Sequence, residues 1–166
     1  MKIQIDDLEF NSDYFYIQNK SIVEKIIFNN RTFYSKYEKF SAPISSILFK
    51  QHQENELSLA VPLIYNDKVN YLVIEYLQED WKTFLALIKH LFKTLKISHY
   101  SIYHHPKKEL LQIFIHKDNI PLETAYKDVD EIKFILEFKS KKSYKIFPNR
   151  NLPKNYNIIT LPSQKI

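Results

Sequence analysis

The first 65 residues have a hydrophobic pattern that is typical of β-strands. Short runs rich in aromatic and β-branched side chains alternate with polar turn residues. Asn29-Asn30 and Asn66-Asp67-Lys68 each separate two such runs and predict tight hairpins, because asparagine tolerates a positive φ. Ser41-Ala42-Pro43 predicts the cap and first turn of a short helix. The predicted elements are strands at 13–18, 22–28, 31–37 and 57–65, and a helix at 44–53.

From residue 69 onward the pattern changes to strand, helix, strand, strand, helix, strand. The clearest element is the helix predicted at 81–96, with Asp80 as its cap and an apolar stripe that includes Phe84, Ile88 and Phe92. The lysine row on its other side is most simply the water-facing side of an amphipathic helix. The other elements are strands at 69–76, 99–105, 110–116 and 143–147, and a helix opened by Pro121.

This order of elements predicts an α+β fold. With right-handed crossovers, residues 69–147 are expected to form a ferredoxin-like (βαββαβ) core, an antiparallel sheet with both helices on one face. Residues 1–65 would form a β-rich half around that core, and 148–166 an extended C-terminal segment. We expect 1–166 to be one domain, since no linker interrupts the chain.

The chain contains neither glycine nor cysteine, and the two absences exclude different classes of site. Ordinary usage would give about a dozen glycines in 166 residues. Phosphate-binding P-loops, dinucleotide fingerprints and nucleophile elbows need backbone that only glycine allows, so these enzyme classes are excluded. Without cysteine there are no disulfides and no thiolate metal sites. With no signal segment or membrane-length apolar run, the sequence predicts a cytoplasmic protein without a membrane partner.

The positive charge is concentrated at the C-terminus. Residues 139–166 hold seven of the 24 basic residues and no acidic one, whereas the rest of the chain is slightly acidic. Such a segment is either a solvated tail or an attractor of phosphate groups. The candidate phosphate- or nucleic-acid-binding residues include two aromatic neighbours for stacking, and they are Lys139, Lys141, Lys142, Lys145, Arg150, Lys154, Tyr144 and Phe147.

Strand alternation groups several polar residues on the predicted sheet face that the helices leave open. A hairpin turning at Lys107-Lys108 pairs residues whose numbers sum to 215, which places His99 opposite His116. If strands 69–76 and 110–116 are parallel neighbours, Glu75 lies near the same end. These three residues then suit a divalent metal or general acid–base catalysis, although they can equally be polar residues that fill a solvated or covered face.

Aromatic residues on the same open face allow two interpretations. Their rings can stack bases, as open-sheet aromatics do in RNA-recognition domains, or they can be a core against which the N-terminal half packs. The ligand candidates are Tyr71, Tyr103, Gln112 and Phe114.

The stretches VNYLVIEY, LIKHLFKTLKI and FPNRNLPKNYNIITLP resemble those of a small bacterial family known only as a domain of unknown function, from about Ser45 onward. A more distant likeness is to the palms of primase-polymerases and RNA-recognition folds, with Glu75 and His116 near their acidic and histidine positions. The paired aspartates and the glycine-rich turn are missing here. The resemblance therefore implies a binding fold without polymerase chemistry.

Three functions remain open from the sequence. The leading one is a non-enzymatic nucleotide- or nucleic-acid-binding protein that uses the basic C-terminal segment. The second is a metal-dependent phosphoryl- or nucleotidyl-transfer enzyme with its site at Glu75, His99 and His116. The third is a protein–protein interaction module whose extended C-terminal segment docks on a partner protein.

Overall fold

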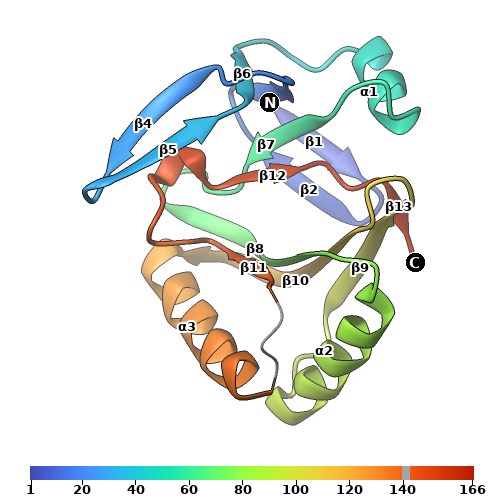
Figure 1. Ribbon diagram of the computed structural model, residues 1–166, viewed down its shortest axis with the longest axis vertical. Helices are drawn as coiled ribbons and strands as arrows, with labels where there is room; N and C mark the ends of the chain where they lie inside the picture. Colours follow the sequence, from blue (N-terminus) through green and yellow to red (C-terminus); the bar gives the residue numbers. More distant parts are fainter. Residues whose placement is uncertain (140–142) are drawn as a thin grey trace. The chain divides into compact units, whose positions relative to one another are not determined.

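The computed structural model describes residues 1–139 and 143–166, and these residues form two compact units. The first unit consists of Met1–Asn66 with Asn149–Leu161, and the second of Asp67–Pro148 with Pro162–Ile166 (Figure 1). The chain therefore leaves the second unit at Pro148, returns to the first, and comes back for its last five residues. The architecture is mixed α+β with antiparallel sheets. In the part of the chain that the structure describes, no helix is both long and apolar enough to cross a bilayer.

The first unit is built mainly from strands. It contains a four-stranded sheet in the order β12-β7-β3-β6. Two further hairpins, β1–β2 and β4–β5, are separate from this sheet. The elements are β1 (Lys2–Ile5), β2 (Leu8–Asn11), β3 (Phe15–Gln18), β4 (Glu24–Phe28), β5 (Arg31–Ser35), β6 (Tyr37–Phe40), α1 (Ser46–Gln53), β7 (Leu59–Pro62), the 3-10 helix η1 (Lys154–Tyr156) and β12 (Ile158–Thr160).

Asparagine and aspartate make the tight turns that glycine makes in most proteins. Asn29 and Asn30 have φ of 50° and 59° and join β4 to β5, which confirms the first predicted hairpin. Asn66 and Asp67 also have positive φ, but the second predicted hairpin is wrong. The strands that this turn connects belong to different sheets, because β7 pairs with β3 and β12 while β8 pairs with β10 and β11.

The second unit contains a five-stranded antiparallel sheet in the order β11-β8-β10-β9-β13. Helices α2 and α3 both lie on one face of this sheet, as the sequence predicted (Figure 1). The elements are β8 (Lys68–Leu77), α2 (Trp81–Leu95), β9 (Tyr100–His105), β10 (Leu110–Pro121), α3 (Leu122–Lys139), β11 (Lys145–Phe147) and β13 (Gln164–Lys165).

The hairpin between β9 and β10 has the predicted register. Gln112 pairs with Tyr103 and Phe114 with Ser101, so the paired numbers sum to 215. The predicted parallel arrangement of the neighbouring strands 69–76 and 110–116 is wrong, because β8 and β10 run antiparallel. Strands β8 and β9 run in the same direction, and β10 lies between them. Because β10 forms a hairpin with β9, it runs antiparallel to β9 and therefore also to β8.

Aromatic pairs attach α2 to the sheet. Phe84 stacks on Tyr76 with the ring centroids 4.1 Å apart, and Phe92 meets Tyr100 at 4.8 Å. Phe84, Ile88 and Leu91 are fully buried, which confirms the apolar stripe predicted for this helix. Because burial of each such side chain is worth about 1.5–3 kcal/mol, this stripe is a main source of stability for the second unit.

Both predicted helix caps differ in detail from the structure. The side chain of Ser45, and not Ser41, caps α1 by accepting a hydrogen bond from the Leu48 amide at 3.2 Å. Helix α2 begins after Asp80, but the Asp80 side chain makes no capping hydrogen bond. It accepts a hydrogen bond from the Tyr76 hydroxyl at 2.6 Å, which ties the start of α2 to the preceding strand.

Candidate nucleic-acid interface

The described cations of the C-terminal segment are all exposed to solvent. Lys139 ends α3 and Lys145 lies on β11, an edge strand of the sheet in the second unit. Arg150 and Lys154 belong to the first unit, in the loop between Pro148 and β12. Lys141 and Lys142, which the sequence also selects, lie outside the described residues. Each unit thus presents two of the four candidate cations that the structure describes.

A buried asparagine holds the loop that carries two of these cations. Asn157 is fully buried, and its side-chain oxygen accepts a hydrogen bond from the amide of Asn149 at 2.6 Å. Its amide group donates to the main-chain oxygens of Asn149 and Pro153 at 3.3 and 3.1 Å. One side chain therefore closes the turn from 149 to 157, and Arg150 and Lys154 extend from a fixed backbone.

The sequence predicted an extended C-terminal segment at 148–166. In the structure this segment forms a 3-10 helix and two short strands. After the 3-10 helix, β12 joins the edge of the four-stranded sheet through pairing with β7. The last residues form β13, which pairs with β9 in the second unit. The prolines at 148, 153 and 162 lie between these short elements, where a missing amide hydrogen costs no ladder hydrogen bond.

The two aromatic residues that the sequence selected within this segment differ in exposure. Phe147 is buried with 7% of its surface exposed, so its ring presents no face for a stacked base. Tyr144 is half-buried and stacks on Phe84 with the centroids 6.1 Å apart. Burial, with a smaller contribution from the Glu137 charge, raises the pKa of the Tyr144 hydroxyl.

An exposed aromatic pair, which sequence reasoning missed, directly precedes the basic segment. Phe134 and Phe138 lie four residues apart on α3, are 65% and 79% exposed, and meet edge to face with centroids 5.2 Å apart. The signal was present in the pattern: both residues fall outside the apolar stripe of Leu122, Ala125, Val129, Ile132 and Leu136. Large aromatic side chains on the polar side of a helix are typical of a binding surface.

Glu75 does not join the two histidines. In the antiparallel register Glu75 pairs with Gln112, whereas His116 pairs with Tyr71, four residues away along β8. The Glu75 carboxylate accepts a hydrogen bond from the Gln112 amide at 2.8 Å and lies opposite Lys145 on β11. Within 1–139 and 143–166, no three histidine, aspartate or glutamate side chains lie close enough together to hold a metal ion. The predicted grouping of Glu75 with His99 and His116 was therefore wrong, since it depended on a parallel strand pair.

Burial raises the pKa of the Glu75 carboxyl, and the Gln112 hydrogen bond and the Lys145 charge only partly oppose this effect. A carboxyl whose pKa is higher in the folded protein than in the unfolded one favours folding when it is protonated. Its contribution is fully present below the ordinary value of 4.5 and is lost as the pH rises through the folded value.

We therefore expect Glu75→Gln to stabilise the protein progressively as the pH increases above the ordinary carboxyl range. Glutamine keeps the shape and can accept the Gln112 hydrogen bond, but it has no charge to desolvate. The measurement is the free energy of unfolding of variant minus wild type, compared at acidic and neutral pH. A difference that does not grow with pH would show that the ionised carboxylate is not penalised in the fold.

The two histidines do form a polar cluster, with Ser101 and Tyr71, on the face away from the helices. The His99 and His116 rings stack with centroids 4.1 Å apart, and the His116 amide donates to the His99 carbonyl at 3.0 Å. Ser101 Oγ and His116 Nε2 are 2.7 Å apart, and the edge of Tyr71 meets the His116 ring at 5.2 Å. Because Ser101 is buried within a regular strand, this contact fixes the His116 ring in place.

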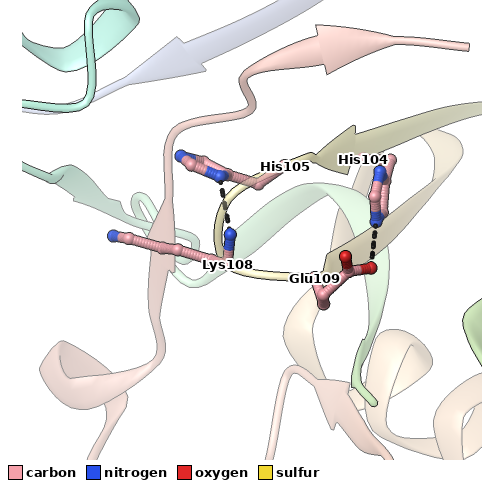
Figure 2. A network of polar contacts seen from close by, with 4 residues as sticks. All are labelled: His104, His105, Lys108 and Glu109. Atoms are coloured by element: carbon pink, nitrogen blue, oxygen red, sulfur yellow. Dashed lines mark hydrogen bonds and ion pairs between the residues drawn. The ribbon is translucent and has the colours of Figure 1, made fainter. Parts of the chain in front are cut away.

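His104 and His105 are consecutive residues at the end of β9, and their side chains point to opposite sides of the strand (Figure 2). His104 stacks on Trp81 with the centroids 3.9 Å apart, and its Nε2 lies 3.4 Å from the Glu109 carboxylate. His105 Nδ1 accepts a hydrogen bond from the Lys108 amide at 3.1 Å, which closes the turn. Burial lowers the pKa of the Lys108 amine. These histidines have structural roles that their sequence spacing alone did not reveal.

The four residues that the sequence selected as ligand candidates on the sheet face away from the helices are all buried. Tyr71, Tyr103, Gln112 and Phe114 have exposed fractions of 5%, 1%, 3% and 0%. Tyr103 and Phe114 meet edge to face at 5.7 Å, and Tyr71 and Phe114 at 5.9 Å. These ring contacts, all within the second unit, are those of a packed aromatic layer.

Part of the chain matches a known protein family. Residues 1–71 match the family model described as "Domain of unknown function (DUF1882)". No curated protein matches the chain. The family match ends in β8, so it covers all of the first unit except 149–161. The match supports the predicted resemblance to a family of unknown function. It lies in the N-terminal part of the chain, whereas the resemblance was expected from about Ser45 onward, so the two ranges share only residues 45–71.

Proposed function

We propose that this protein binds single-stranded nucleic acid, without catalysis, through Phe134, Phe138 and the basic segment that follows them. The observation that carries this proposal is that an exposed aromatic pair lies directly before the basic segment in the chain. Two exposed phenylalanine rings lead directly into 28 residues, 139–166, that contain seven basic residues and no acidic one. Sequence-tolerant binding of single strands combines aromatic rings that stack bases with cations that contact phosphates.

The two kinds of contact have separate roles in this proposal. Bases stack on Phe134 and Phe138, since every base has a π-face and the rings are open to solvent. Lys139 follows Phe138 immediately and contacts the adjoining phosphate. Lys145, Arg150 and Lys154 are exposed and add electrostatic attraction to other phosphates along a flexible strand.

We also propose that residues 67–148 form a ferredoxin-like core. Support comes from the strand order β11-β8-β10-β9, the antiparallel pairing throughout and the two helices on one face. Strand β13 is an addition at the edge next to β9. Nucleic-acid binding is one common use of this frame, but the usual open-sheet mode does not apply here, because the aromatic residues of that face are buried.

Replacing both exposed phenylalanines tests the stacking part of the proposal. Phe134→Ala together with Phe138→Ala should weaken binding of a single-stranded oligonucleotide by roughly 1–3 kcal/mol per stacked base. The salt dependence of the affinity should change little, because no phosphate contact is removed. Fluorescence anisotropy with a labelled oligonucleotide at several salt concentrations measures both quantities.

Tyr34→Ala is the matched control for this variant. Tyr34 is also a large aromatic residue, 60% exposed, but it lies on β5 in the first unit, away from the basic segment in the sequence. The control should bind as the wild type does. Equal affinity of the double alanine variant and the wild type would contradict base stacking on α3. The pair would then be an apolar contact for a protein partner, the interaction-module alternative.

A further inference from the structure

The exposed face of α2 carries a straight stripe of four lysines, Lys82, Lys89, Lys93 and Lys96. Lys82, Lys89 and Lys93 lie within the helix, and Lys96 is its C-terminal cap. At 3.6 residues per turn, these positions fall within about 60° of the helix circumference and extend for about 21 Å along its axis. All four side chains are exposed. We call them the α2 lysine stripe.

The charge pattern of α2 differs from that of the other long helix. Residues 81–96 contain no acidic side chain, whereas α3 carries five acidic residues together with three lysines. Lys89 and Lys93 are spaced i,i+4 and Lys93 and Lys96 i,i+3, and like charges at these spacings destabilise a helix. An ordinary water-facing helix relieves such repulsion with interleaved glutamates. Helix α2 retains the repulsion, which an anionic ligand along the stripe would relieve.

From this pattern we propose that the α2 lysine stripe binds the phosphate backbone of duplex nucleic acid. The proposal goes beyond the single-strand function above, because it uses different residues and a different form of nucleic acid. The helix is held against the sheet by buried Phe84, Ile88 and Phe92, so the four lysines project from a rigid straight support. A regular row of cations on such a support matches a regular row of phosphates, and a duplex backbone has that regularity.

Two other anionic partners fit the stripe less well. Single strands are held by stacking as well as by charge, and the aromatic rings of α2 are buried or half-buried on the side that faces the sheet. Membrane-surface helices insert an apolar face into the lipid, but the apolar face of α2 is already packed in the core. The exposed side of this helix carries the four lysines and no fully exposed phenylalanine, tyrosine or tryptophan, and charge is the main requirement for contact with a duplex backbone.

The test replaces Lys82, Lys89, Lys93 and Lys96 together by glutamine, which preserves helix propensity. Binding to short labelled DNA and RNA duplexes is measured by anisotropy across a salt series. With four contacts to B-form DNA, the wild-type slope of log affinity against log salt should contain a contribution of roughly −3 to −4 from the stripe. The glutamine variant should lose that contribution, and the four-fold arginine variant should retain it.

Two further variants make the outcome specific. The first replaces four exposed lysines located elsewhere, Lys20, Lys25, Lys36 and Lys68, by glutamine and so has the same net charge as the stripe variant. It should keep most of the duplex affinity. The second neutralises Lys139, Lys145, Arg150 and Lys154, and it should keep the stripe contribution to duplex binding even if single-strand binding is lost. This second variant separates failure of the stripe from failure of the single-strand proposal.

Three results would overturn the proposal. The first is a wild-type protein that does not bind duplexes at low salt. The second is a stripe variant that binds duplexes with unchanged affinity and slope. The third is an equal loss in the control that lacks the four other lysines, since the binding would then follow net charge and not the α2 lysine stripe. A circular dichroism spectrum like that of the wild type would show that the stripe variant is folded.

Discussion

Neutralising the four candidate cations that the structure describes should nearly abolish the salt dependence of single-strand binding. If Lys139, Lys145, Arg150 and Lys154 each contact a phosphate, the wild-type slope of log affinity against log salt is roughly −3. Replacement of all four by glutamine should bring the slope close to zero and weaken binding about equally for every base sequence. Raising the salt from 50 to 200 mM should reduce wild-type affinity by about 50-fold, and variant affinity only slightly.

The matched control for this charge effect is the variant that lacks Lys20, Lys25, Lys36 and Lys68, which has the same net charge. Its slope should stay close to the wild-type value. A control slope as flat as that of the segment variant would mean that the whole surface, and not the C-terminal segment, attracts the nucleic acid. In the same salt series the Phe134 and Phe138 variant should show lower affinity with an unchanged slope.

Loss of the Asn157 side chain should destabilise the protein by about 2–4 kcal/mol, because each of its three hydrogen bonds contributes about 0.5–1.5 kcal/mol net. Asn157→Ala removes three hydrogen bonds to Asn149 and Pro153 and leaves their main-chain groups without this partner. Thermal or urea unfolding followed by circular dichroism measures the loss. The variant should also bind single strands more weakly, since Arg150 and Lys154 extend from the loop that Asn157 closes.

Asn155→Ala provides the comparison at the same kind of residue. The Asn155 side chain is exposed, and its main-chain oxygen, which accepts a hydrogen bond from the Tyr16 hydroxyl, is unaffected by the change. This substitution should change stability by less than about 0.5 kcal/mol. If Asn155→Ala and Asn157→Ala were equally mild, the hydrogen bonds of Asn157 would not be what holds the loop.

The second unit was more predictable from the sequence than the first. Helix α2 has an uninterrupted 3.6-residue apolar period, and its predicted bounds of 81–96 differ from the observed ones by a single residue. The β9–β10 register followed from strand alternation and one turn. In the first unit, the hairpin of β1 and β2 was missed, because these four-residue strands begin in a stretch with many polar side chains. The turn at Asn66-Asp67 was recognised, but local turn chemistry does not determine to which sheet each strand belongs.

The candidate site was only partly predictable, for a related reason. Exposure of Lys139, Lys145, Arg150 and Lys154 follows from their charge, whereas Phe147 was expected to stack bases and is buried on a short strand. Placing Glu75 beside His99 and His116 required the relative direction of β8 and β10. The predicted ferredoxin-like order already makes these neighbours antiparallel, so the parallel pairing was inconsistent with the predicted fold.

The most direct test of the single-strand proposal is an anisotropy titration of the wild-type protein with a labelled, mixed-sequence single-stranded DNA and its RNA equivalent. Low salt is the condition of choice, because electrostatic attraction is strongest there. The proposal predicts saturable binding of the single strands, with an affinity that falls with a slope of roughly −3 as salt is added. No binding of either strand at low salt would contradict it, and the C-terminal cations would then form a solvated edge of the protein.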